Sequence, residues 1–183
     1  MTPAQIALIA IALLPLVAAL RRWPPDIHFL LPALGYAAMG GLKLTQSRIA
    51  LSQAPAPGNA YSDTYYTVSN GHFLLSSAII FAVLAGVIWI QRRFGALIYP
   101  KLTLACFWLL HGAWLVQAGI TLSASTVFRP PRRYIDYPEF MQQIAGISSA
   151  SAKGIGLALL GLLALLIVSI AARITSERHR EAE

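Results

Sequence analysis

Residue types that carry common enzyme chemistry are scarce in this chain. Cys106 is its only cysteine, which excludes an intrachain disulfide and any CxxC metal or redox site. Charged residues make up only 11% of the 183 residues. No nucleophile triad, phosphate-binding glycine loop or carboxylate pair can be recognised, and too few polar residues occur in apolar runs to form a transport path. The sequence therefore gives no support to a hydrolase, a nucleotide-binding protein or a transporter.

Apolar stretches dominate the composition instead. Hydrophobic residues make up 57% of the chain, and the mean hydropathy is +0.63, which is typical of a membrane protein. The formal net charge is +7, but the basic residues form short clusters beside the apolar stretches. Such clusters orient a protein in a bilayer. We therefore expect the lipid bilayer as surroundings and no nucleic-acid partner.

Five apolar runs are long enough, or nearly so, to cross a hydrocarbon core of roughly 30 Å at ~1.5 Å per helical residue. They are Pro3–Leu20, Ile27–Leu44, Tyr65–Ile90, Leu97–Leu122 and Ile155–Ala172. The runs predict an all-α integral membrane bundle of about five transmembrane helices, with residues 1–183 as a single membrane domain. No basic region precedes the first run, so a retained helix is favoured over a signal peptide.

Short polar signals predict where some helices begin and how they pack. Asp63 and Thr64 are suitable N-caps for the third helix, because a side-chain oxygen can accept an unpaired backbone N–H. Pro138 followed by Glu139 is typical of a helix start, so the fifth helix is expected to begin well before its apolar run. The pair Gly40-Gly41 indicates close helix packing or a bend.

Three basic clusters set the expected orientation. They follow the first, third and fifth apolar runs, and they consist of Arg21 and Arg22, then Arg92 and Arg93, then Arg173, Arg178 and Arg180. All three fall on one side of the membrane if the N-terminus is outside. The positive-inside rule then predicts a cytoplasmic C-terminus, and we expect the bacterial inner membrane as the location.

His72 is the main candidate for a functional side chain. It lies about two turns into the third predicted helix, inside an apolar segment. A polar side chain within the bilayer is costly without a partner, so a ligand role is a reasonable hypothesis. The alternative is a core histidine that is hydrogen-bonded to a neighbouring helix.

Arg132 and Arg133 form a second candidate site on the expected outer side. They follow two prolines, which stiffen the chain and present both guanidinium groups. Paired arginines suit the two propionates of a haem, since guanidinium and carboxylate groups can form two parallel hydrogen bonds. Binding to lipid phosphates is the alternative. Together with His72, these arginines indicate a haem site.

The other histidines are expected to have structural or surface roles. His111 lies near the middle of the fourth run, between Trp108 and Trp114 at helical spacing. A buried aromatic cluster with a hydrogen-bonded histidine is favoured there over metal ligation. His28 near the inner surface and His179 in the charged tail are both expected to be solvated.

Two motifs resemble subunit I of the haem-copper oxidases, the cytochrome c oxidase family. The segment Asp63-Thr-Tyr-Tyr-Thr-Val-Ser-Asn-Gly-His-Phe-Leu-Leu-Ser76 is similar to the start of that family's tenth helix, and Pro131-Arg-Arg-Tyr-Ile-Asp-Tyr-Pro138 resembles the loop before its twelfth. The resemblance implies that helices two to five correspond to the family's ninth to twelfth. It would cover nearly all of this chain, as a short form of the family's C-terminal part.

The resemblance also implies roles for individual residues. His72 matches the axial ligand of the low-spin haem, and Arg132 and Arg133 match the arginines that hold haem propionates. Asn70 stands where the family has the axial histidine of the high-spin haem. The helices that would supply copper ligands are missing, so we expect no copper and no oxidase activity from this chain alone.

The favoured interpretation is a membrane haem-binding protein, with haem of b-type held by iron ligation to His72. It would act in respiratory electron transfer or oxidase assembly, with other respiratory subunits or a second copy of itself as partners. One alternative is an accessory subunit without a cofactor. Another is a split fragment of a terminal oxidase that a second chain completes.

Overall fold

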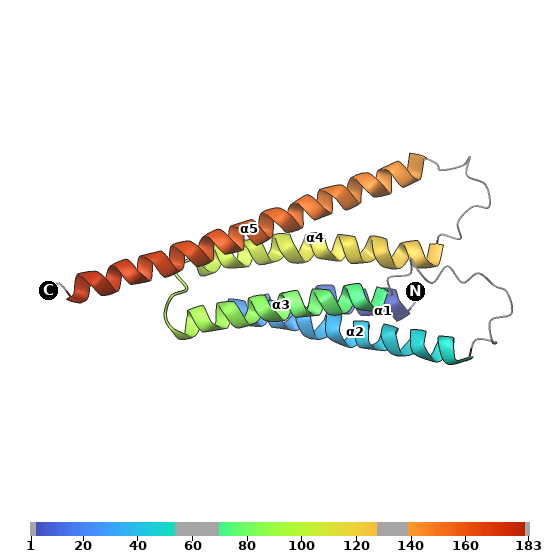
Figure 1. Ribbon diagram of the computed structural model, residues 1–183, viewed down its shortest axis with the longest axis horizontal. Coiled ribbons are helices and arrows are strands. Elements are labelled where there is room, and N and C mark those ends of the chain that lie inside the picture. Colours follow the sequence, from blue (N-terminus) through green and yellow to red (C-terminus); the bar gives the residue numbers. More distant parts are fainter. Residues whose placement is uncertain (1–2, 54–69, 128–138, 182–183) are drawn as a thin grey trace.

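The computed structural model describes residues 3–53, 70–127 and 139–181, and within these ranges the chain is helical without strands (Figure 1). Five helices are present: α1 (Pro3–Leu20), α2 (Pro25–Gln53), α3 (Asn70–Arg93), α4 (Pro100–Val127) and α5 (Glu139–Glu181). The all-α prediction is confirmed. Four of the helices contain stretches long and apolar enough to cross a membrane, whereas the apolar part of α1, Leu8–Leu20, is shorter.

Two connections between helices use the same capping geometry. Arg22 and Gly95 both have positive φ, of 52° and 68°, directly after α1 and α3. After α1, the Trp23 N–H donates to the Ala18 carbonyl at 2.9 Å; after α3, the Ala96 N–H donates to the Gln91 carbonyl at 2.7 Å. These bonds satisfy carbonyls that the helix itself leaves unpaired, so both helices end sharply.

The helices form two antiparallel pairs. α2 packs most extensively on α3, and α4 packs on α5, while α1 lies against α2 and α4 (Figure 1). A Cβ placed on Gly40 of α2 would lie 3.0 Å from the backbone nitrogen of Leu75 on α3, so this glycine permits the close approach that the sequence indicated. Cys106 of α4 is half-buried, and its sulfur would lie 3.1 Å from a Cβ on Gly161 of α5.

Aromatic rings fill the core between α2, α3 and α4. Phe29 and Tyr36 of α2, Phe81 of α3, and Phe107 of α4 are fully buried, and Trp114 of α4 is 7% exposed. Phe81 contacts both Phe107 and Trp114 edge to face. The outward faces carry exposed leucine, isoleucine and valine side chains, as expected for helices that face lipid.

The basic clusters gather at one end of the bundle. α1 and α3 end there, α2 and α4 begin there, and the C-terminal part of α5 extends past it (Figure 1). At this end Arg92 of α3 forms an ion pair with Asp26 of α2, with 3.0 Å between Nε and Oδ1. Which side of the membrane this end faces stays a prediction.

Candidate functional site

His72 is the third residue of α3, at the end of the bundle opposite the basic clusters (Figure 1). Its side chain is exposed, and its ring makes no hydrogen bond within the described ranges. The alternative of a core histidine bonded to a neighbouring helix therefore does not fit. The expected cap at Asp63 and Thr64 lies outside the described residues.

His72 begins a continuous exposed stripe on α3. Its members recur at alternating intervals of four and three residues, so they share one helix face: His72, Ser76, Ile79, Val83, Gly86 and Ile90. The two polar members lie one turn apart near the N-terminal end of α3, and the rest are apolar or small. The stripe therefore carries one imidazole at the start of a mainly apolar face.

Arg132 and Arg133 lie outside the described residues, so their distance to His72 stays a prediction. The helices that flank them can be placed. α4 ends at Val127 and α5 begins at Glu139, both at the end of the bundle where α3 begins (Figure 1). The chain therefore leaves α4 and enters α5 at the same end as His72.

His111 lies in the aromatic surroundings that the sequence predicts. It is 1% exposed, and its ring stacks on Phe107 at 5.4 Å between centroids and meets Phe81 edge to face at 5.9 Å. The aromatic cluster is thus confirmed. The ring is directed at the backbone of Ile11 on α1, although neither ring nitrogen forms a hydrogen bond of good geometry in the described part of the chain. The Tyr36 ring centroid lies 6.5 Å from that of His111, and the Tyr36 hydroxyl also has no hydrogen-bond partner among the described residues.

The expectation that His28 is solvated is wrong. Its side chain is 2% exposed, with Nδ1 3.2 Å from the Pro24 carbonyl and the ring edge against Phe107 at 5.8 Å. The short connection after α1 folds this first turn of α2 inward, which sequence position alone did not indicate. The side chain of His179 is not described.

No group of three or more histidine, cysteine, aspartate or glutamate side chains that could hold a metal ion is found among the described residues. An axial haem ligand does not need such a group, since the porphyrin supplies the other nitrogens. The assignment of His72 to haem iron stays a prediction.

Sequence reasoning missed several polar contacts between helices. Trp114 donates its indole N–H to the Ser77 hydroxyl at 2.6 Å, which joins α4 to α3. Gln117 of α4 accepts from Ser148 and Ser151 of α5, at 3.1 and 2.7 Å. Lone polar residues in apolar runs were the available signal, but their partners depend on helix rotation.

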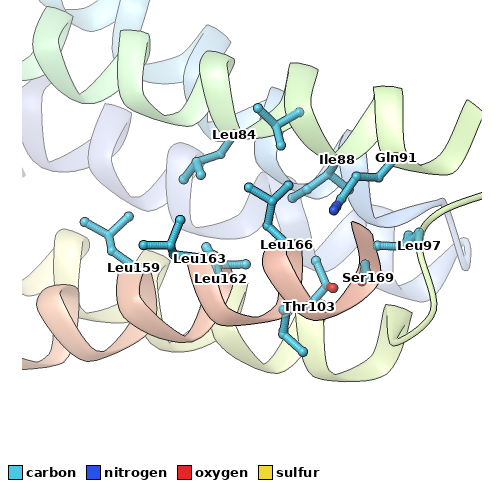
Figure 2. A pocket seen from close by; sticks show the side chains of 12 residues that line it. Leu84, Ile88, Gln91, Leu97, Thr103, Leu159, Leu162, Leu163, Leu166 and Ser169 are labelled. Atoms are coloured by element: carbon cyan, nitrogen blue, oxygen red, sulfur yellow. The ribbon is translucent and has the colours of Figure 1, made fainter. Parts of the chain in front are cut away.

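An apolar groove between α3 and α5 was also missed. A cavity of about 260 Å³ is lined mainly by leucines from both helices, with Gln91, Thr103 and Ser169 at one end (Figure 2). No sequence motif marks it, because its walls come from helices that are neighbours only through α4.

Comparisons with known proteins confirm the resemblance inferred from the two motifs. No family model matches the chain, and no solved structure matches it. The chain is 33% identical over 148 residues to cytochrome c oxidase subunit 1 of Cereibacter sphaeroides, which covers 71% of this chain and 23% of that protein. It is 35% identical over 83 residues to cytochrome c oxidase subunit 1 of Corynebacterium diphtheriae, covering 43% of this chain and 14% of the relative.

A third relative is a probable cytochrome c oxidase subunit 1-alpha of Streptomyces coelicolor, 32% identical over 81 residues, with 42% of this chain and 13% of that protein covered. The chain thus spans less than a quarter of the length of each of these relatives. It is an integral membrane protein that is similar to part of cytochrome c oxidase subunit 1.

Proposed function

We propose that this chain is a haem-binding membrane subunit of an oxidase-type respiratory complex, with His72 as an axial ligand and Arg132 and Arg133 at the haem propionates. It would sit in the bacterial inner membrane with its N-terminus outside. Bound haem, of b-type, would supply one-electron transfer. Oxygen reduction would not occur on this chain alone.

The exposure of His72 is the observation that carries this proposal. An imidazole at the end of an apolar face loses hydrogen bonds to water when lipid surrounds it, at a cost on the order of a few kcal/mol. Iron ligation would offset that cost. The apolar and small residues that follow it on the same stripe would suit a porphyrin face or a covering helix.

A second axial ligand would have to come from outside the described helices. His111 is enclosed by aromatic rings in the core, on the far side of α3 from the exposed stripe, so the two imidazoles cannot flank one iron. This arrangement favours a second chain, or a second copy, that covers the stripe.

The test is the absorption spectrum of the protein purified from haem-supplied membranes. We expect a Soret band that is lost in His72→Ala while the protein still inserts. The matched control is Ser76→Ala, one turn along the same exposed stripe, which should keep the band, as should His111→Ala. Loss of haem in His111→Ala and retention in His72→Ala would contradict the assignment.

The propionate assignment has its own readout. The double variant Arg132→Ala with Arg133→Ala should weaken haem retention and lower the midpoint potential, because removing positive charge favours oxidised iron. Lysine at both positions should restore part of the potential but less of the retention. If the wild-type protein binds no haem in isolation or with its neighbouring subunits, the chain is a cofactor-free accessory subunit.

A further inference from the structure

The groove between α3 and α5 consists of two connected cavities. The two helices do not approach each other closely anywhere along their described lengths. Leu84 and Ile88 of α3 face Leu163 and Leu166 of α5 across a cavity of about 260 Å³ (Figure 2). A second cavity of about 640 Å³ shares Gln91 and two further lining residues with the first, so the groove continues toward the basic end of the bundle.

Gln91 is the polar group at the junction of the two cavities. Its side chain is 8% exposed, and its Nε2 has no hydrogen-bond partner in the ranges that the structure describes. Figure 2 shows this nitrogen turned toward the groove, opposite Ser169. Buried amide donors are almost always paired, so an acceptor oxygen inside the groove would explain this side chain.

A positive charge follows at the basic end. Arg173 lines the second cavity and is four residues after Ser169, which places it about one turn, ~6 Å, further along α5. It donates to the Phe94 carbonyl and stacks over the Phe94 ring at 5.9 Å, which holds the guanidinium beside the groove. Because a guanidinium carries five donors, it can bind an anion while keeping that bond.

Along the groove the lining therefore changes from leucine to amide and hydroxyl, and then to guanidinium. A phospholipid presents hydrocarbon, ester carbonyl and phosphate in the same order. We propose that the groove is a binding site for one anionic phospholipid, whose ester carbonyl accepts from Gln91 and whose phosphate faces Arg173. A transmembrane helix fits less well, because its backbone carbonyls already accept bonds within the helix and its apolar face offers no anion to Arg173.

The test uses the full chain, delipidated in detergent and titrated with phosphatidylglycerol or phosphatidylcholine, with lipid adducts counted by native mass spectrometry. The wild type should bind one phosphatidylglycerol about fivefold more tightly than phosphatidylcholine, as expected for one interfacial arginine. Arg173→Gln should remove this preference, and Arg173→Lys should keep most of it. Arg93→Gln, an exposed arginine outside the groove, should leave it unchanged.

A second pair of variants tests the groove itself. Leu163→Trp should fill it and lower retention of both lipids, whereas Leu160→Trp, on an exposed leucine that does not line it, should not. Gln91→Leu should weaken the binding of both lipids equally. Equal retention in the two tryptophan variants, or an anionic preference that survives Arg173→Gln, would overturn the proposal. So would a Leu163→Trp variant that releases a protein partner and keeps its lipid, because the occupant would then be another chain.

Discussion

α3 faces α2 and α5 in different ways. Against α2 it packs closely, with Gly40 opposite Leu75 and an ion pair between Arg92 and Asp26. Against α5 it leaves a groove, because mainly apolar side chains of α3 face leucines of α5. Lipid tails are as apolar as leucine, so apolar surface alone does not draw helices together in a bilayer. Small residues and polar bonds determine which helix faces pack against each other, and the remaining helix faces are accessible to ligands.

The largest expected effect comes from filling the close approach between α2 and α3. In Gly40→Leu the first added carbon would lie 2.9 Å from the Leu75 side chain and 3.1 Å from the Gly71 carbonyl, so backbone must move. We expect a loss of about 3 kcal/mol or more in the free energy of unfolding, measured by SDS titration in mixed micelles.

The neighbouring glycine is the matched control for that variant. A Cβ on Gly41 would meet nothing within 4 Å, so Gly41→Leu should be neutral or stabilise by up to about 1 kcal/mol through helix propensity. Equal losses in the two variants would mean that the glycines serve the backbone of α2 and not its packing against α3.

A smaller loss is expected when the ion pair is broken. The Asp26 side chain is 9% exposed and that of Arg92 is 44% exposed, with Arg92 Nη2 donating to Oδ2 at 3.1 Å. Asp26→Ala should cost about 2 kcal/mol, between the values for exposed and buried pairs. A double-mutant cycle with Arg92→Ala measures the coupling, and a coupling near zero would show that the pair does not join the helices.

Removing the hydrogen bond between α3 and α4 is expected to cause the third-largest loss of stability. Ser77→Ala removes the acceptor of the Trp114 indole and should cost about 1–2 kcal/mol, because the buried N–H is then unpaired. Ser76→Ala, on the adjacent exposed residue, should change stability by less than about 0.5 kcal/mol in the same titration. A comparable loss in both would point to an effect on helix propensity instead of the lost bond.

The helices were largely predictable, but not their full lengths. Hydrophobic runs mark the part of each helix within the membrane, whereas backbone hydrogen bonding continues through polar residues beyond it. α2 therefore extends to Gln53 instead of Leu44, and α5 extends to Glu181. The start of α5 at Glu139 was predictable, since proline and an acidic residue form a local signal that needs no tertiary information.

The pairing of faces could not be predicted from the sequence. The helices are apolar on nearly every side, so their sequences do not distinguish a core face from a lipid face. His28 and His111 are both buried and His72 is exposed, although His28 was expected to be solvated and His72 lies in an apolar segment. The unpaired nitrogen of Gln91 depends on the separation of α3 from α5, which no local pattern encodes.

The smallest effect on the free energy of unfolding is expected at the groove between α3 and α5. Leu163 and Leu162 both line the groove, but Leu163 is 52% exposed, whereas Leu162 is 8% exposed and belongs to the core. Leu163→Ala should change the free energy of unfolding by no more than about 0.5 kcal/mol, because few protein contacts are lost. Leu162→Ala should cost about 2 kcal/mol or more through lost packing. A large loss in Leu163→Ala would show that α5 closes onto α3 in the membrane, which would make both boundaries of α3 packed interfaces and leave no groove for a lipid.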